Sequence, residues 1–529
     1  MGKKVLALLL AAAMVLSVSA CGSTAETQQS SSTAQSTSEA IAGESQKAAA
    51  YLERDDWADD VKVAANSFME LYGKNSESYD DTSYVVFDFD NTCSIFDVEE
   101  QTAIYQLRTM SFAFTPEELP DILKTEIGDL NEDRTDAGYG KGSYQNWIND
   151  ITKAYTYLYE TYGPFTYKGL TEKQQKEIQK DPQWLEFATK MRAMYDLIFD
   201  CESASVAYPW VLYWFTGMTE DEVYDVALRS HKTYMAVETS EVTWTSPKEI
   251  KSEVGVVEYT WTSGTQVTKN IVELMKVLQE NGIDVWICSA SLTETIKAAV
   301  DAWGLHDYVT GLIAMTVDTD DNGKYVNAYN FKNGCGWVAE ANGKWKRDTA
   351  PTMAQTQGAG KVTAINNTLV AKYGHGPIAG FMDSTGDFNF CTEYETLKLV
   401  ICFNRASRKV TDGGGLIAEV AMYEKDTLNY DLASANGAGD TLYVLQGRDE
   451  NGMRTLRNSN LTLRYDSTDE QLFRDEDNEA QLQYMIDHKM TVEDILNTFA
   501  IKTAEDDKNN PLGFKYGFLS EYSGYHSQK

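Results

Sequence analysis

The stretch that decides the fold is YVVFDFDNTCSIFDVEE, Tyr84–Glu100. It begins with an apolar run at 84–87, the pattern of a strand buried on both faces. Asp88 and Asp90 follow where this strand ends. Burying two carboxylates costs free energy unless cations or hydrogen-bond donors pair with them. The stretch therefore predicts a strand whose carboxyl end carries functional acids, with a solvated strand end as the alternative.

Similar apolar runs return further along the chain and alternate with helical patterns. The strand-like runs are 283–288, 378–382, 397–403 and 441–445, and the helical segments are 51–74, 266–280, 292–303 and 361–373. This alternation predicts an α/β fold with a doubly wound parallel sheet. Ligands bind beyond the carboxyl ends of the strands in such sheets. Ser289 and Asp383, which follow two of the runs, are therefore expected to lie near Asp88 and Asp90.

Four short motifs occur in order along these segments. They are Asp88-Phe-Asp-Asn-Thr92, Ile287-Cys-Ser289, Lys361 at a helix start, and Asp383-Ser-Thr-Gly-Asp387. Together they resemble the motifs of the haloacid dehalogenase (HAD) superfamily, although Met382 stands where that family usually has a glycine. The resemblance implies a Rossmann-like core with a large helical cap inserted after the first core strand.

The resemblance also implies phosphoryl transfer through an aspartyl-phosphate. It makes Asp88 the nucleophile, and it makes Asp90 the acid and base that serves the leaving alcohol and the water. Mg²⁺ would be held by the side chains of Asp88 and Asp383 and by the backbone carbonyl of Asp90. Asp387 would orient Lys361 or a metal-bound water.

The same resemblance assigns the phosphate-binding groups to Thr92, Ser289 and Lys361. Two of these assignments have alternatives in the sequence. Ser289 has the residue type of a helix N-cap. A different lysine could also serve in place of Lys361, and the candidates are Lys324, Lys344 and Lys346.

A narrower resemblance concerns the substrate. The DxDNT form, Ser289-Ala-Ser291 and Asp97-x-Glu99-Glu100 resemble segments of bacterial phosphorylcholine phosphatases. Glu99 and Glu100 are therefore expected to bind the substrate's head group. Aromatic side chains of the cap could complete a cage for a cation, and helix-core packing is their alternative role. These aromatics are Tyr155, Tyr157, Tyr159, Tyr162, Tyr208, Trp210, Tyr213, Trp214 and Phe215.

The first residues of the chain predict export. Lys3 and Lys4 precede an apolar segment at 5–18, and Val18-Ser-Ala-Cys21 resembles a lipobox in which Cys21 is diacylated. An ordinary cleaved signal peptide is the alternative, and the short apolar run disfavours a membrane span. The expected location is the extracytoplasmic face of the cell membrane, where the lipid would hold the protein.

The expected domain order follows from these features. It comprises a lipoprotein signal peptide at 1–20, a flexible tether at 21–46, a catalytic core at 47–100 and 261–450, a helical cap at 101–260, and a C-terminal helical extension at 451–529 that packs on the core or the cap. Inside the core, Asp318–Gly323 resembles the start of a calcium loop. Position 329 is Tyr rather than Glu, so a hairpin turn at Asn322-Gly323 is favoured.

Charge and composition limit the function classes. The formal net charge of −34 argues against a nucleic-acid partner. The five histidines have no metal-ligand spacing, which disfavours a zinc site. The resulting hypothesis is an exported, Mg²⁺-dependent phosphomonoesterase whose partner is a small phosphomonoester such as phosphocholine or phosphoethanolamine. A phosphoserine-like or broad-specificity phosphatase and a non-catalytic lipoprotein that binds choline-type solutes are the alternatives.

Overall fold

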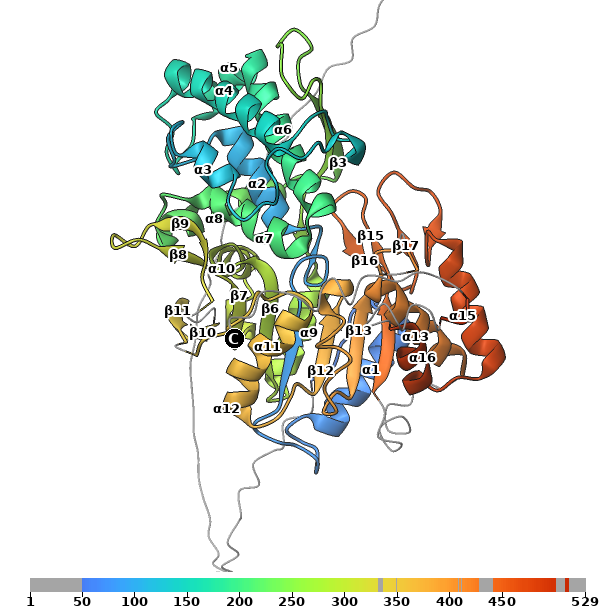
Figure 1. The fold of residues 1–529 in the computed structure, drawn as a ribbon. Coiled ribbons are helices and arrows are strands. Elements are labelled where there is room, and N and C mark those ends of the chain that lie inside the picture. Colours follow the sequence, from blue (N-terminus) through green and yellow to red (C-terminus); the bar gives the residue numbers. More distant parts are fainter. Residues whose placement is uncertain are drawn as a thin grey trace, which may run out of the picture. The chain divides into compact units, whose positions relative to one another are not determined.

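Strand β1 (Tyr84–Phe87) lies inside an eight-stranded sheet whose order is β11-β10-β7-β6-β1-β12-β13-β14 (Figure 1). The computed structural model describes residues 50–331, 336–348, 350–407, 409–410, 412–427, 441–500 and 510–512. Strands β7 to β14 in this order are parallel, and β10 and β11 form an antiparallel hairpin at one edge. The predicted doubly wound α/β sheet is confirmed.

The sheet strands and the helices that pack on them have the following bounds. The strands are β1, β6 (Asp284–Leu292), β7 (Gly311–Met315), β10 (Gly336–Glu340), β11 (Lys344–Arg347), β12 (Ala379–Met382), β13 (Leu399–Phe403) and β14 (Leu442–Gln446). The helices are α1 (Asp59–Tyr72), α9 (Lys269–Glu280), α10 (Thr293–Ala302), α11 (Ala359–Ile365), α12 (Ala371–Tyr373) and α13 (Gly413–Thr427), with a π-helical turn at Asn366–Val370 between α11 and α12.

Alternate side chains of β1 enter two different cores, as the two-residue period of a strand requires. Val85 and Phe87 pack with apolar residues of α1, α9 and α10. Tyr84 and Val86 pack with α11 and α13. Each of these side chains is fully buried. A strand buried on both faces explains why the apolar run at 84–87 is continuous.

The segment between β1 and β6 is mostly helical, as predicted. Its elements are β2 (Ser94–Ile95), α2 (Val98–Thr109), α3 (Leu119–Leu123), α4 (Tyr144–Tyr162), α5 (Glu172–Ile178), α6 (Pro182–Cys201), α7 (Ala204–Leu212), α8 (Glu220–Tyr234), β3 (Ser240–Thr245), β4 (Glu258–Ser263) and β5 (Gln266–Val267). Short 3₁₀ turns lie at Thr135–Ala137 and Tyr213–Phe215. The antiparallel β3–β4 hairpin is an addition that the helical pattern did not predict. The expected boundaries at 100/101 and 260/261 fall inside α2 and β4, and the division into cap and core stays a prediction.

Smaller elements complete the fold. They are β8 (Val317–Thr319), β9 (Tyr325–Tyr329), β15 (Arg448–Asp449), β16 (Thr455–Leu456), β17 (Thr462–Leu463), β18 (Glu470–Gln471), α15 (Glu476–His488) and α16 (Val492–Phe499), with 3₁₀ turns at His306–Tyr308 and Thr385–Asp387. β8 and β9 pair antiparallel around Asn322-Gly323, so the predicted hairpin turn is confirmed. Strands β15–β18 form a separate four-stranded sheet, which we call the C-terminal sheet. The region after 450 therefore contains strands as well as the expected helices.

The expected signal peptide, tether and lipidated Cys21 lie outside the described residues. Among the described residues, no helix is both long enough and apolar enough to span a membrane.

Candidate active site

The carboxyl end of β1 carries the first two acids of the site. The Asp88 backbone N–H donates to Phe381 O of β12 at 3.0 Å, which continues the sheet pairing as far as Asp88. After Asp90 the chain turns sharply, because Asn91 has a left-handed φ of 64°. This turn directs the Asp88 and Asp90 side chains into one inner chamber of about 90 Å³. β1 has β6 and β12 as its neighbours, so the site lies where the chain's path across the sheet reverses.

Lys361 of α11 lies buried between two aspartates. Its Nζ donates to Asp88 Oδ1 and to Asp387 Oδ1, each at 2.6 Å. Burial acts to lower the pKa of Lys361, but the charges of Asp387 and Asp88 outweigh it and raise that pKa. The ammonium is therefore fixed in its charged form beside Asp88. The alternative lysines (Lys324, Lys344 and Lys346) are all exposed.

Asp383, at the end of β12, is bound from two sides. Thr92 Oγ1 donates to its Oδ1 at 3.3 Å, and Arg405 Nη1 donates to its Oδ2 at 2.9 Å. Burial raises the pKa of Asp383 to about 7 although Arg405 opposes the shift. Thr92 thus contacts the expected metal ligand, and a role for it toward phosphate stays a prediction.

The donor set fits a divalent metal ion. One carboxylate oxygen each of Asp88, Asp383 and Asp387 lies within 4.8 Å of the others, and all three residues are buried. Oxygen-only donors of this kind suit Mg²⁺. These three carboxylates face two cations, Lys361 and Arg405. The remaining negative charge favours a bound cation, and Asp387 belongs to this donor set as well as contacting Lys361.

Asp90 accepts hydrogen bonds on both oxygens. Val98 N–H donates to Oδ1 at 2.7 Å, and Ser291 Oγ donates to Oδ2 at 2.6 Å. Burial, followed by the charge of Asp88, raises the pKa of Asp90 to about 7, while Ser291 and Val98 act against the shift. A carboxyl group with this pKa can both give and take a proton near neutral pH.

Ser289 is fully buried inside β6 and does not cap α10, whose N-cap is Leu292. Its Oγ lies 3.5 Å from Asp90 Oδ2 and accepts from the Ser291 N–H at 3.1 Å. The structure therefore places Ser289 beside the acids, as expected. Its contact with a phosphate stays a prediction.

The two expected head-group residues have different surroundings. Glu99 is buried, its Oε2 accepts from the Leu292 N–H at 3.0 Å, and burial raises its pKa to about 7. The Glu100 side chain is 46% exposed and pairs with Arg192 at 3.2 Å. Both residues line the inner chamber, and Glu100 also lines a larger one. Glu100 is thus the one of the two that faces the larger cavity.

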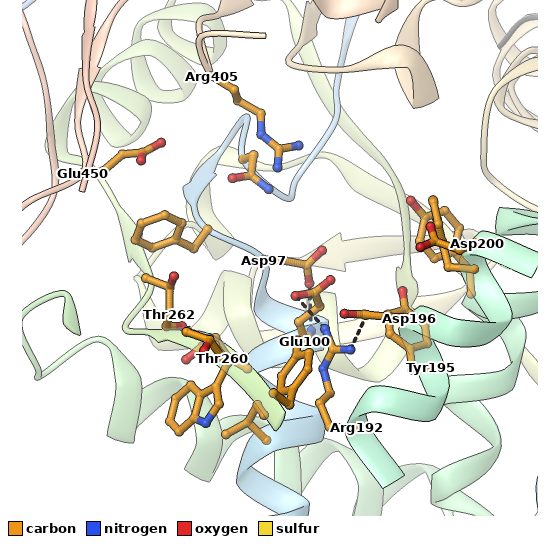
Figure 2. A pocket seen from close by; sticks show the side chains of 18 of the residues that line it. Asp97, Glu100, Arg192, Tyr195, Asp196, Asp200, Thr260, Thr262, Arg405 and Glu450 are labelled. Atoms are coloured by element: carbon orange, nitrogen blue, oxygen red, sulfur yellow. Dashed lines mark hydrogen bonds and ion pairs between the residues drawn. The ribbon is translucent and has the colours of Figure 1, made fainter. Parts of the chain in front are cut away.

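The larger, outer chamber has a volume of about 550 Å³ and shares Asn91, Asp97, Glu100, Tyr195, Tyr208 and Arg405 with the inner chamber. Its size is typical of small-molecule pockets. Figure 2 shows several of its charged side chains, among them Glu100, Arg192 and Arg405. The inner chamber suits a phosphoryl group beside the aspartates, and the outer chamber suits the rest of a substrate.

Several lining residues were not identified from the sequence. Tyr208 was among the expected aromatics, but Tyr195 and Tyr259 were not, and most of the other expected aromatics are buried in the cap. Ser291 was noted only as part of a motif. Arg405 could have been found from the sequence, because it follows the apolar run that became β13. Each of the other predicted strands that ends in polar residues contributes a side chain to the site. Arg448 of β15 and Arg464, which follows β17, had no such signal in the sequence.

No family model and no curated protein matches the chain. Among solved structures, a conserved protein of unknown function from Anaerococcus prevotii is 25% identical with a TM-score of 0.61, and the match covers 79% of this chain and 99% of that one. A protein of unknown function from Bordetella pertussis (14% identity, TM-score 0.28, 61% and 89% coverage) and a cytosolic 5′-nucleotidase IIIB bound to cytidine (12%, 0.24, 75% and 82%) are more distant. The first likeness supports the fold, and the other two are too weak to inform the chemistry.

Proposed function

We propose that this protein is a Mg²⁺-dependent phosphomonoesterase of the HAD type that acts through an aspartyl-phosphate. One observation carries the proposal: the buried Lys361 links Asp88 to Asp387, and Asp383 completes a carboxylate cluster at the end of β1. If Lys361 and its aspartates served only to stabilise the fold, neither a third buried carboxylate, Asp383, nor Asp90 with its raised pKa would be needed beside them.

In the first step an Asp88 carboxylate oxygen attacks phosphorus. A new O–P bond forms to Asp88, and the bond from phosphorus to the ester oxygen breaks. Asp90 gives its proton to the departing alkoxide, which leaves as the alcohol. Lys361 stays beside Asp88 and offsets the negative charge of the phosphoryl group.

In the second step Asp90, now ionised, removes a proton from water. The water oxygen attacks phosphorus, the bond to Asp88 breaks, and inorganic phosphate leaves with Asp88 restored. Asp88, Asp383 and Asp387 would hold Mg²⁺, which when bound supplies positive charge to the phosphoryl oxygens. Asp90 thus ends the cycle protonated, as it began.

The outer chamber favours esters of amino alcohols, of which phosphocholine and phosphoethanolamine are simple examples. Asp97, Glu100 and Asp196 all line it near the inner chamber. These carboxylates would attract a positively charged head group. The exposure of Glu100 supports it in this role, whereas Glu99 lines only the inner chamber, so its part in head-group binding stays a prediction.

Phosphate release by the purified protein tests this proposal. The panel contains phosphocholine, phosphoethanolamine and p-nitrophenyl phosphate, each with Mg²⁺ and with EDTA. We expect metal-dependent release from p-nitrophenyl phosphate and stronger release from the amino-alcohol esters. Release from none of them, together with choline binding by titration calorimetry, would favour the non-catalytic binding lipoprotein instead.

The lipid anchor belongs to the same proposal. We expect Cys21→Ala to move the protein from the membrane fraction to the soluble fraction and to abolish incorporation of labelled palmitate. Protease added to intact cells should digest the anchored protein, because the proposed location is the extracytoplasmic face. If the variant stays in the membrane fraction, Cys21 does not carry a lipid anchor.

A further inference from the structure

The outer chamber has two walls of opposite charge. We call the first the acidic wall, formed by Asp97, Glu100, Asp196 and Asp200 with one cation, Arg192. We call the second the basic wall, formed by Arg405, Arg448 and Arg464 with one acid, Glu450. Figure 2 shows Arg405 and Glu450 on one side of the cavity and Glu100, Arg192 and Asp196 on the other.

Arg192 of the acidic wall stacks on two aromatic rings that also line the outer chamber. Its guanidinium lies 4.7 Å from the Tyr195 ring centre and 4.5 Å from that of Tyr259. It also pairs with Glu100 at 3.2 Å and Asp196 at 2.5 Å. A cation stacked on both rings leaves these faces unavailable to a quaternary ammonium group.

The acidic wall nevertheless keeps an excess of negative charge, because four carboxylates face one guanidinium. Glu100 and Asp196 are partly exposed, at 46% and 31% of their side chains, and so they retain oxygens that can accept hydrogen bonds. A primary ammonium group donates up to three hydrogen bonds, whereas a trimethylammonium group donates none. The wall therefore suits a primary ammonium group better than choline.

The basic wall has the complementary excess. Arg448 is buried, and its guanidinium donates hydrogen bonds to Glu450 and to Asn91. Arg405 and Arg464 are partly exposed, at 46% and 24% of their side chains, although Arg405 Nη1 also donates to Asp383 at 2.9 Å. Arg464 lies 3.8 Å from Glu450, and its Nη1 donates to the Arg405 carbonyl at 3.1 Å. That hydrogen bond links the two exposed arginines on the same side of the cavity.

The opposite charges of the two walls indicate which charged groups a ligand should have. A planar guanidinium recognises a carboxylate through paired hydrogen bonds. A simple amino alcohol has no group to offer the basic wall, whereas a leaving group with both an ammonium and a carboxylate would complement both walls. The phosphoryl group itself would lie in the inner chamber, next to Lys361.

We propose that the preferred substrate is a phosphomonoester of a zwitterionic alcohol, with a primary ammonium toward Glu100 and Asp196 and a carboxylate toward Arg405 and Arg464. O-phosphoserine is the smallest probe of this class. The inference rests on the proposed phosphomonoesterase activity and narrows its substrate class.

Matched substrates test the two charges one at a time. O-phospho-L-serine differs from phosphoethanolamine by its carboxylate, and from 3-phosphoglycerate by an ammonium in place of a hydroxyl. We expect kcat/KM for phosphoserine to exceed that for each of the others by about tenfold or more, since each charge adds a charge-assisted hydrogen bond. Equal or lower values for phosphoserine, with p-nitrophenyl phosphate still hydrolysed, would overturn the inference and leave the phosphatase intact. No hydrolysis of any ester would overturn both.

A variant of the basic wall supplies the second test. Arg464→Met should lower the ratio of kcat/KM for phosphoserine to that for phosphoethanolamine by about tenfold, because only phosphoserine has a group for that side chain. Arg457→Met is the matched control, since Arg457 pairs with Glu470 on the surface and lines neither chamber. An unchanged ratio in Arg464→Met would exclude Arg464 from carboxylate recognition and overturn the two-wall assignment.

Discussion

Asp90 combines two features that proton transfer requires. Its pKa of about 7, raised by burial and by Asp88, lets the protonated and ionised forms coexist near neutral pH. The hydrogen bonds from Val98 and Ser291 fix the direction of each oxygen. Both the orientation of Asp90 and its pKa therefore suit it to proton transfer. Ser291 is the side chain that orients it.

We expect Ser291→Ala to lower kcat for alkyl phosphates by about 10- to 100-fold, because general acid catalysis of this kind contributes roughly 10²- to 10⁴-fold. The loss should be much smaller for p-nitrophenyl phosphate, whose leaving group needs little protonation. Steady-state kinetics on both esters measure the difference. The control is Ser78→Ala at an exposed loop position. Equal losses on the two esters would show that Ser291 acts on something other than the leaving-group proton.

Asp88→Asn should abolish turnover on every ester, because the amide is not a nucleophile toward phosphorus. The variant should also fail to retain ³²P after acid quenching, whereas the wild type should trap it on the protein. Asp136→Asn changes an exposed aspartate outside both chambers and is the matched control. Activity retained in Asp88→Asn would place the nucleophile elsewhere.

At the scale of elements, the C-terminal sheet contacts the left-handed turn at Asn91. Arg448 of β15 donates to Asn91 O at 3.1 Å and to Asn91 Oδ1 at 3.3 Å. Glu450 accepts from Arg448 at 2.7 Å, and both residues are buried. Because Asn91 follows Asp90 directly, this pair supports the left-handed turn that directs both acids into the inner chamber.

Arg448→Lys should therefore lower kcat by about tenfold, since an ammonium keeps the charge but cannot make the forked contact to Asn91. Asn91→Gly keeps the backbone geometry at φ 64° and removes only the side-chain acceptor. If the two residues act together, the double variant loses less than the product of the single losses. If the losses in kcat multiply in the double variant, Arg448 does not act through the turn at Asn91. Arg457→Lys is the surface control.

Sequence reasoning predicted the elements that carry a clear hydrophobic period. The runs that became β1, β6, β12 and β13 are each buried strands. Asp88, Asp90 and Asp383 meet at the carboxyl ends of β1 and β12, and Lys361 of α11 contacts Asp88 there. The two-residue strands β15–β18 are too short to show a period. Arg192 and Arg448 lie far along the chain from the motifs, so only tertiary packing could bring them to the chambers.

At the scale of the whole molecule, α8 and α10 share a buried histidine. His231 of α8 is fully buried, and its Nε2 lies 3.0 Å from Thr295 O of α10. In this arrangement the neutral ring donates from Nε2. Burial lowers the pKa of His231 from 6.5 to about 4, although the Thr295 carbonyl opposes the shift. The α8–α10 contact therefore requires an uncharged imidazole.

This shift predicts an acid-dependent loss of stability. Above pH 6.5 the ring is neutral in both the folded and unfolded states, and the full contribution of His231 is present. As pH falls toward 4, only the unfolded state takes up the proton, so the free energy of unfolding drops by up to about 3 kcal/mol. Carboxylates titrate over part of the same range, and the comparison must therefore be made against a variant.

His231→Gln keeps a side-chain donor for Thr295 and cannot be charged. Urea unfolding at pH 7 and pH 4.5 should show a smaller loss of stability for this variant than for the wild type, by about 2 kcal/mol or more. His488→Gln replaces an exposed histidine on α15 and should lose as much as the wild type. If His231→Gln and the wild type lose the same amount between these pH values, the imidazole is not what couples the α8–α10 contact to pH, and the acid sensitivity of the molecule lies in its buried carboxylates.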